Sequence, residues 1–185
     1  MAKTPSKMIP LGSQAPLFCL LDVVSGQPIR LNKSPSVKGT VIMFICNHCP
    51  YVKHIQKGIV QLANDYATRG IQFIAINSND IENYPDDSPE NMKLTAIRES
   101  YPFPYLFDEN QDIAKAYQAT CTPDFFVYDT NLNLIYRGQF DDSRPGNQIP
   151  ITGDSIRSAL DCLLEGKPVF EAQKPSLGCN IKWKM

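Results

Sequence analysis

The order of apolar and polar positions along the chain predicts strands that alternate with helices. Residues 40–46, TVIMFIC, form an unbroken apolar run of the kind found in a strand buried on both faces. From Pro50 the apolar positions change to helical spacing, which continues to about Arg69, where Gly70 favours a helix end. Residues 71–77 then repeat the pattern of a buried strand. The sequence therefore predicts a strand–helix–strand unit in this region.

The same alternation continues through the second half of the chain. Residues 88–100 predict a helix capped by the serine at its start, and residues 104–108 a short strand. Residues 110–118 predict a short helix, and residues 124–139 two strands joined by a turn. A last helix is predicted over residues 153–164. Together these elements predict an α/β fold with a mixed central sheet flanked by helices.

The two ends of the chain have weaker patterns. The first 39 residues are rich in Pro, Ser and Gly, and their short apolar segments at 17–23 and 29–31 predict a small hairpin in an N-terminal extension. Residues 165–185 carry few helix or strand signals and are expected to form a tail that packs on the domain. We therefore expect one domain over residues 1–185, which is long enough to bury a substantial core.

Charge and composition exclude some partners and compartments. The 18 basic and 19 acidic residues give a formal net charge of −1, which offers no electrostatic reason to expect nucleic acid or an anionic membrane surface. The N-terminal sequence lacks the apolar core of a signal peptide, and no apolar stretch approaches the roughly 20 residues that span a bilayer. We expect a cytoplasmic protein.

A close pair of cysteines is the strongest chemical feature of the sequence. Cys46 and Cys49 stand where the first buried strand gives way to the first long helix. In a reducing compartment such a pair more often indicates redox chemistry or metal binding than a structural disulfide. Free N–H groups at the helix start would stabilise a thiolate on Cys46, His48 would add positive charge beside it, and Cys49 would attack a mixed disulfide on Cys46.

A Thr-Pro dipeptide supports the redox interpretation. Thr122 and Pro123 come immediately before a predicted strand, about seventy residues downstream of the cysteine pair. If Pro123 is cis and its loop faces the first helix, the Thr122 backbone lies beside the dithiol. An extended substrate backbone would then form hydrogen bonds with it. A trans proline in an ordinary loop is equally compatible with the sequence.

The sequence as a whole resembles thioredoxin-fold proteins, and more narrowly the peroxiredoxin-like branch of the alkyl hydroperoxide reductase and thiol-specific antioxidant (AhpC/TSA) superfamily. The motifs that carry this resemblance are CNHCPYV, AINSND, YPDDSPENMK, YPFPYLFDENQDIAKAY, CTPDFFVYD, YRGQFDDSRPGN and GCNIKWK. They lie between about Ile9 and Lys184. The resemblance implies a thioredoxin-like fold and thiol redox activity that needs no cofactor. A reductant such as thioredoxin or a glutathione-type thiol would reset the enzyme.

The peroxidase signature of that superfamily is incomplete here. A peroxiredoxin needs a Pro-x-x-x-Thr/Ser-x-x-Cys arrangement. With Cys49 as the peroxidatic residue, Ile42 takes the proline position and Cys46 the hydroxyl position. With Cys46 instead, the two positions hold Gly39 and Met43. The sequence therefore favours a thiol–disulfide oxidoreductase that acts on protein or glutathione-type disulfides, with a peroxidase as the alternative.

The four other cysteines have more than one interpretation. Cys121 precedes the Thr-Pro dipeptide and is either a third thiol near the site or a packed loop residue. Cys179, in the tail, is either a resolving cysteine or an anchor that packs the tail. Cys19 and Cys162 lie in apolar patterns and are expected in the core.

Two further hypotheses compete with the redox enzyme. A metal-binding module would use Cys46, Cys49 and His54, a set suited to Cu(I) or Zn(II), although His54 lies five positions past Cys49 and no fourth ligand is evident. A non-catalytic thioredoxin-fold scaffold is the other hypothesis. We expect no resident metal. The acidic pair Asp86-Asp87 is expected in a solvated turn.

Overall fold

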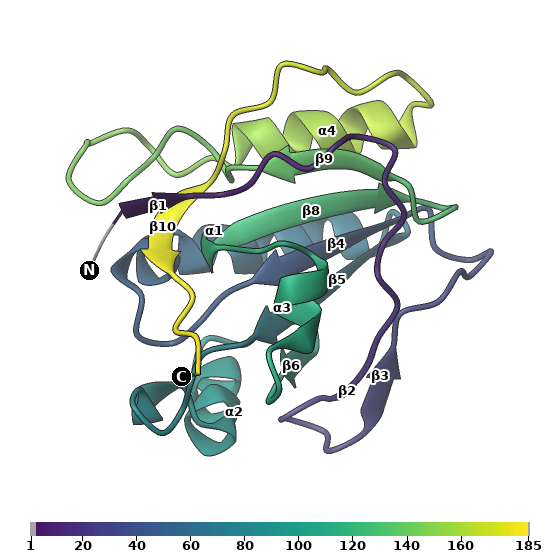
Figure 1. Cartoon of the computed structure of the whole chain (residues 1–185). Helices are drawn as coiled ribbons and strands as arrows, with labels where there is room; N and C mark the ends of the chain where they lie inside the picture. Colours follow the sequence, from purple (N-terminus) through teal and green to yellow (C-terminus); the bar gives the residue numbers. More distant parts are fainter. Residues whose placement is uncertain (1–2, 185) are drawn as a thin grey trace.

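A five-stranded mixed sheet forms the centre of the structure, a computed structural model that describes residues 3–184 (Figure 1). Its strand order is β6-β5-β4-β8-β9. Strands β4, β5 and β6 are parallel, while β8 runs antiparallel to β4 and β9 antiparallel to β8. The strands are β4 (Gly39–Phe44), β5 (Ile71–Asn77), β6 (Tyr105–Phe107), β8 (Asp124–Asp129) and β9 (Leu134–Gly138). This arrangement confirms the predicted thioredoxin-like α/β fold.

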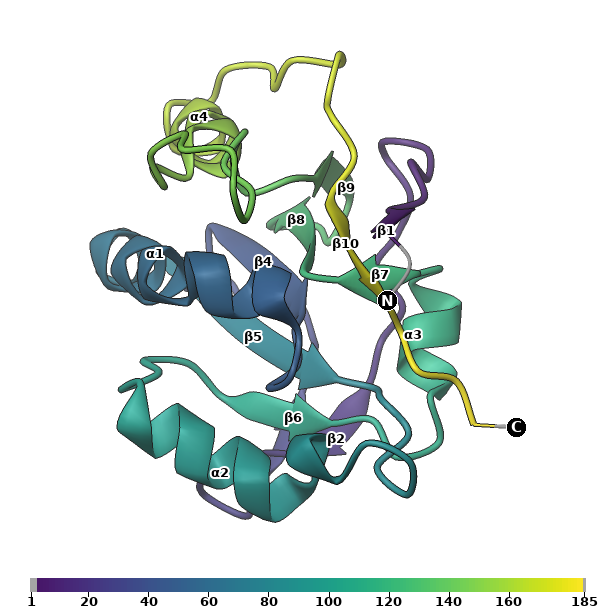
Figure 2. The ribbon, with the colours of Figure 1, turned by 90° about the vertical axis from the view of Figure 1, so that its left-hand side faces the viewer.

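Helices cover both faces of the sheet, which explains the unbroken apolar run of its central strand. All six residues of β4 are buried. Three helices pack on one face, whereas α3 and the N-terminal segment pack on the other (Figure 2). The helices are α1 (Pro50–Ala67), α2 (Pro89–Arg98), α3 (Asp112–Ala116) and α4 (Asp154–Leu164), with a 3₁₀ turn η1 (Pro85–Asp87) before α2. Because both faces of the sheet are covered, a polar residue at every second position of β4 would be buried without a hydrogen-bond partner.

The predicted N-terminal hairpin is present as β2 (Cys19–Leu21) and β3 (Pro28–Arg30). The prediction that Cys19 and Cys162 lie in the core was wrong, because Cys19 is exposed and Cys162 is half-buried. Side chains alternate along β2, so only its middle residue faces inward. Cys162 lies beside the buried stripe of α4 rather than within it.

A second sheet joins the two ends of the chain to the centre of the molecule. It consists of β1 (Lys3–Pro5), β10 (Leu177–Asn180) and β7 (Cys121–Thr122), in the order β1-β10-β7 and antiparallel throughout. The tail pairs with β1 and β7 as a strand that its sequence pattern did not predict. Gly178 of β10 lies in close contact with the backbone of β7. A Cβ atom at Gly178 would lie 2.0 Å from the carbonyl oxygen of Thr122.

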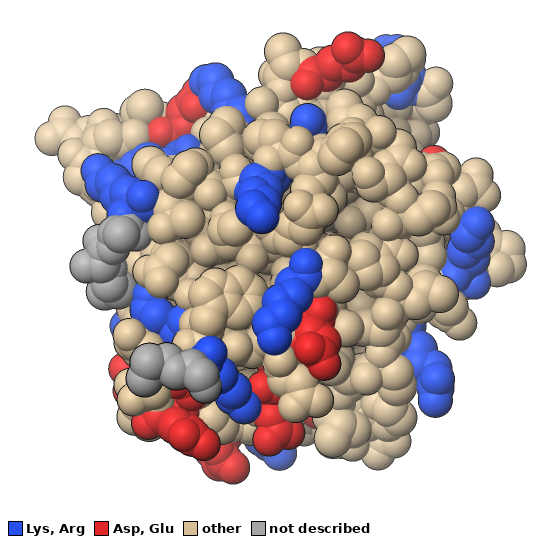
Figure 3. Space-filling model, in the orientation of Figure 1, with Lys and Arg blue, Asp and Glu red and all other residues tan. Residues whose placement is uncertain are grey.

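The surface carries charges of both signs. On the face that Figure 3 shows, basic and acidic side chains are interspersed among uncharged residues. This distribution agrees with the near balance of charge in the sequence. Among residues 3–184, no helix combines the length and the hydropathy that crossing a membrane would require.

Candidate active site

The structure brings the cysteine pair and the Thr-Pro dipeptide together. The Thr122-Pro123 peptide bond is cis, as the redox interpretation required. The Sγ atom of Cys46 lies 3.2 Å from the Thr122 hydroxyl oxygen, and the Sγ atom of Cys49 lies 3.2 Å from the Thr122 carbonyl oxygen. Thr122 thus contacts both sulfurs, one through its side chain and the other through its backbone.

Both cysteines are almost completely enclosed. Cys46 lies in the turn after β4 and is 2% exposed, and Cys49 is the N-cap residue of α1 and is 0% exposed. Both are free thiols in the structure. A reaction with any external molecule therefore requires a local opening of the segments that cover them.

The pKa values of the two cysteines favour the thiolate on Cys49, whereas the sequence predicted it on Cys46. Burial raises the pKa of Cys46, and its hydrogen bond with Cys49 and the negative charge of Asp87 raise it further. The hydrogen bond from Cys46, together with one from the Val52 backbone, lowers the pKa of Cys49 to about 5. Two thiols in contact lose their protons in separate steps, so the pair keeps one proton on Cys46 and one negative charge on Cys49.

A buried carboxylate contributes to this difference, after burial and the contact between the two thiols. The backbone N–H of Asn47 donates a hydrogen bond of 2.7 Å to Oδ1 of Asp87. Nδ1 of His48 lies 2.5 Å from Oδ2 of Asp87, so the imidazole is paired with this carboxylate. Asn79 donates to the same oxygen at 2.8 Å. The helix N-terminus therefore favours a negative charge on Cys49 alone.

Asp87 is the functional candidate that sequence reasoning missed. The expectation of a solvated acidic turn is correct for Asp86, which is exposed, and wrong for Asp87, whose side chain is 0% exposed. Although burial raises the pKa of Asp87, hydrogen bonds from His48 and Asn79 hold it below its usual value. Nothing in a run of two aspartates before a Ser-Pro helix start distinguishes the buried one.

Removing the charge of Asp87 is expected to lower the pKa of Cys46. In the Asp87→Asn variant the Cys46 thiolate would no longer face a carboxylate at close range, so the second thiolate of the pair should appear at lower pH. Thiolate absorbance followed from pH 5 to pH 11 would measure this change. Asp86→Asn, which alters an exposed neighbour, is the control. An Asp87→Asn titration that overlays the wild type would contradict this electrostatic role.

Two further cysteines lie close to the pair, and the structure distinguishes them. Cys179 lies opposite Thr122 in the register of β10 with β7, and it packs in the same apolar cluster as Cys49. Burial and the neighbouring Cys49 raise the pKa of Cys179 to about 12. Cys121 is fully buried, and its Sγ atom lies 3.7 Å from the Pro123 carbonyl oxygen. Cys179 therefore contacts the dithiol, whereas Cys121 packs beneath the Thr-Pro segment.

The residue after the cis proline is a buried acid. Asp124 is 0% exposed, and its Oδ2 atom is buried without a hydrogen-bond partner. Burial raises the pKa of Asp124 well above its usual value, although interactions with Ser176 and Ser6 act in the opposite direction. The acid is therefore protonated in the folded protein at a pH where it would be ionised in the unfolded chain.

This acid should make the protein less stable as the pH rises. The unfolded chain releases the Asp124 proton above about pH 4, whereas the folded chain keeps it, so the free energy of unfolding falls from there toward the raised pKa. Asp124→Asn should remove this loss, so the free energy of unfolding of the variant should change less between pH 4 and pH 8 than that of the wild type. Urea denaturation at pH 4 and pH 8 would measure it. If the variant loses as much stability between these pH values as an Asp86→Asn control, Asp124 is not the group responsible.

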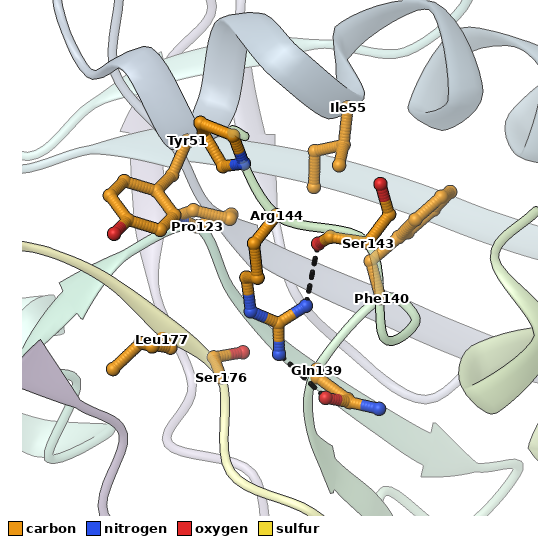
Figure 4. Close-up of a pocket in the computed structure, with 10 residues that line it drawn as sticks. Tyr51, Ile55, Pro123, Gln139, Phe140, Ser143, Arg144, Ser176 and Leu177 are labelled. Carbon is orange, nitrogen blue, oxygen red and sulfur yellow. Dashed lines mark hydrogen bonds between the residues drawn. The ribbon is translucent and has the colours of Figure 1, made fainter. Parts of the chain in front are cut away.

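A small pocket adjoins the cis proline. Figure 4 shows that Tyr51 of α1, Pro123 and Arg144 contribute to its wall. Arg144 donates hydrogen bonds of 2.6 to 2.7 Å to three neutral oxygens, namely the backbone oxygens of Asp141 and Ser143 and the side-chain oxygen of Gln139. Within residues 3–184 no carboxylate forms an ion pair with Arg144. The pocket therefore places the guanidinium group of Arg144 near Pro123, the residue that follows Thr122.

The structure does not assemble the metal ligands that the sequence suggested. His54 lies 2.7 Å from the hydroxyl of Ser143, on the side of α1 that faces the loop before α4. A different set gathers instead, in which ligand atoms of Cys46, His48 and Asp87 all lie within 4.8 Å of one another. These groups already bond to one another or to Thr122, so the cluster is satisfied as a hydrogen-bonded network apart from Nε2 of His48.

The sequence pattern of the AhpC/TSA family matches residues 11–137, which include the cysteine pair and the cis proline. The chain belongs to the AhpC/TSA family. Comparison with curated proteins gave no match.

Solved structures extend the likeness to the whole chain. An uncharacterized conserved protein from Geobacillus kaustophilus is 62% identical with a TM-score of 0.97, over 100% of this chain and 97% of that one. A hypothetical protein from Sinorhizobium meliloti 1021 is 44% identical with a TM-score of 0.95, over 98% of this chain and 99% of that one. Peroxidoxin BcpB from Mycobacterium tuberculosis shares the fold, at 17% identity and a TM-score of 0.61, over 84% of this chain and 96% of that one.

Proposed function

We propose that this AhpC/TSA protein is a thiol–disulfide oxidoreductase that uses Cys46 and Cys49. The observation that carries the proposal is the contact of both sulfurs with Thr122, before a cis proline and at the N-terminus of α1. A negative charge on Cys49 at neutral pH supplies the thiolate that exchange requires. The family supports redox chemistry in general, and the missing proline and hydroxyl positions argue against a peroxidase of the usual type.

In the proposed reaction Cys46 attacks a substrate disulfide after passing its proton to Cys49 along their hydrogen bond. The attacked disulfide breaks, one substrate thiolate leaves, and a mixed disulfide forms on Cys46. Cys49 then loses its proton and attacks the Cys46 sulfur, so the second substrate thiol leaves and the Cys46–Cys49 disulfide remains. Two electrons have moved from the protein to the substrate. A thiol reductant, such as thioredoxin or a glutathione-type thiol, restores the pair.

The surrounding residues have positioning roles in this proposal. The Thr122 hydroxyl donates to a thiolate that forms on Cys46 and so partly offsets its burial. His48 is held by Asp87 on one side and stacks on the Tyr84 ring on the other, with 5.3 Å between the ring centroids. Its role is therefore to partner Asp87 rather than to act as a freely placed cation. Arg144 is placed to bind a carboxylate of the substrate beside Pro123.

Reaction with oxidised glutathione tests the proposal. Fully reduced protein mixed with a small excess of oxidised glutathione should release two glutathione thiols per chain and gain one disulfide, between Cys46 and Cys49. Quenching with acid, alkylating the remaining thiols and peptide mass spectrometry identify the bonded residues. Cys162→Ser, which changes a cysteine on the outer part of α4, should behave as the wild type.

The same protocol with hydrogen peroxide separates exchange from peroxidase activity. Oxidation by glutathione disulfide that is faster than oxidation by equimolar peroxide supports the exchange enzyme. Rapid peroxide consumption with slow disulfide exchange would overturn it in favour of a peroxidase. A pair that remains reduced under both conditions would overturn the redox function altogether.

A further inference from the structure

The chain itself occupies the strand edge that an extended substrate would use. Strand β10 pairs antiparallel with β7, and Cys179 stands opposite Thr122. The approach is close, because a Cβ atom on Gly178 would lie 2.0 Å from the carbonyl oxygen and 2.6 Å from the carbonyl carbon of Thr122. The expectation that Thr122 offers a free backbone platform was therefore wrong for the closed structure. Figure 2 shows β10 running beside β7.

This strand carries a cysteine at the position that faces the dithiol. Cys179 is 2% exposed and packs in the same apolar cluster as Cys46 and Cys49. Thr122 joins the three cysteines, since it lies 3.2 Å from the Sγ atoms of both Cys46 and Cys49 and pairs with Cys179 in the register of β10 with β7. A residue that only anchored the tail could be any apolar side chain. A cysteine at this position also places a third thiol near the reactive pair, where it can take part in disulfide exchange.

The segment after Cys179 is fixed in place as firmly as the segment before it. The Lys182 backbone N–H donates to the side-chain oxygen of Asn79 at 2.8 Å, and the Asp80 N–H donates to the Lys182 carbonyl oxygen at 2.8 Å. Asn79 in turn donates to Asp87, the carboxylate beside Cys46. The tail is thus bonded on both sides of Cys179 to the structure that surrounds the dithiol.

We propose that β10 is an internal substrate strand and that Cys179 is a third redox thiol, which converts the Cys46–Cys49 disulfide into a Cys49–Cys179 disulfide. The inference rests on the proposed function, which supplies the first disulfide. Cys179 attacks the Cys49 sulfur, the bond between Cys46 and Cys49 breaks, and Cys46 leaves as a thiolate that takes up the proton of Cys179. No electrons are gained or lost in this exchange. Cys46 is then a free thiol again, and the oxidising equivalent is held between Cys49 and Cys179.

Disulfide mapping of the Cys46→Ser variant tests the relay directly. This variant removes the competing partner, so in a buffer of oxidised and reduced glutathione it should form a Cys49–Cys179 disulfide. The double variant Cys46→Ser/Cys179→Ser should form no intramolecular disulfide and should carry glutathione on Cys49 instead. The matched control is Cys46→Ser/Cys121→Ser, which removes the other buried thiol near the site and should retain the Cys49–Cys179 bond.

Rapid quenching of the wild type gives a second test that needs no substitution. After one equivalent of oxidised glutathione, Cys46–Cys49 should appear first and Cys49–Cys179 later, while the total number of disulfides stays constant. If Cys46→Ser carries only glutathione on Cys49, and the wild type shows Cys46–Cys49 alone at all times, the relay is overturned while the proposed function stands. If the wild type forms no intramolecular disulfide, the proposed function fails and the relay fails with it.

Discussion

Replacing Cys49 with serine is expected to have the largest effect on exchange, a loss of at least about 10³-fold in the rate at which a bound substrate disulfide is reduced. Cys49 is the sulfur that carries the negative charge, that accepts the proton of Cys46 and that completes the reaction. The variant should stop at a mixed disulfide between Cys46 and glutathione, and release of one glutathione thiol instead of two would show this. The pH dependence should change with it, because the wild type keeps its thiolate down to about pH 5.

The comparison with Cys46→Ser shows which sulfur attacks first. That variant keeps the Cys49 position but lacks the proposed attacking thiol, so its first glutathione release should be slow. If Cys46→Ser reacts with oxidised glutathione as fast as the wild type while Cys49→Ser does not react, Cys49 is the attacking residue, and the order of steps proposed above is reversed.

Replacing Gly178 with alanine is expected to have the largest effect on stability, a loss of about 2–4 kcal/mol in the free energy of unfolding. The added methyl group would overlap the carbonyl group of Thr122, the residue that contacts both cysteines. This backbone cannot move aside as a flexible side chain would. Strand β10 would have to leave β7, and Cys179 would become accessible. Urea denaturation measures the loss of stability, and the rate at which iodoacetamide alkylates Cys179 measures the opening.

Gly146→Ala is the control for this substitution. Gly146 has a positive φ of 88°, and a Cβ atom there would have no neighbour within 4 Å, so the change costs only the backbone strain of about 1 kcal/mol. A Gly178→Ala protein as stable as Gly146→Ala, with Cys179 still protected from alkylation, would show that β10 does not lie on Thr122 as closely as described.

The periodic parts of the fold could be predicted from the sequence because burial imposes its period on the residues. Six of the buried positions of α1 follow the helical spacing, and β4 is apolar at nearly every position because both its faces are covered. The N-terminal hairpin was found from two short apolar segments. The sequence left the cis and trans forms of Pro123 open, and the structure shows the cis form with Thr122 beside the cysteine pair.

The parts that the sequence did not reveal are held by contacts between distant segments. Strand β10 has no alternating pattern, and it is a strand because β1 and β7 pair with its two edges. The residues around Asp87 in the sequence are typical of a solvated turn, whereas its hydrogen-bond partners, Asn79 and His48, come from other segments. Burial of Cys46, its contact with Cys49 and the charge of Asp87 together raise the pKa of Cys46. None of these partners lies close enough in sequence to leave a local signal.

The proposed thiol–disulfide exchange is tested most directly by equilibrating the protein with glutathione buffers of graded potential and mapping its disulfides by mass spectrometry. We expect a reversible disulfide that joins Cys46 to Cys49, with Cys49–Cys179 as its exchange product. The midpoint potential would also show the direction of the reaction, since a value near about −270 mV is typical of a reductase and one well above about −200 mV of an oxidant. If Cys46, Cys49 and Cys179 all stay reduced across the whole range, the protein is not a thiol–disulfide oxidoreductase.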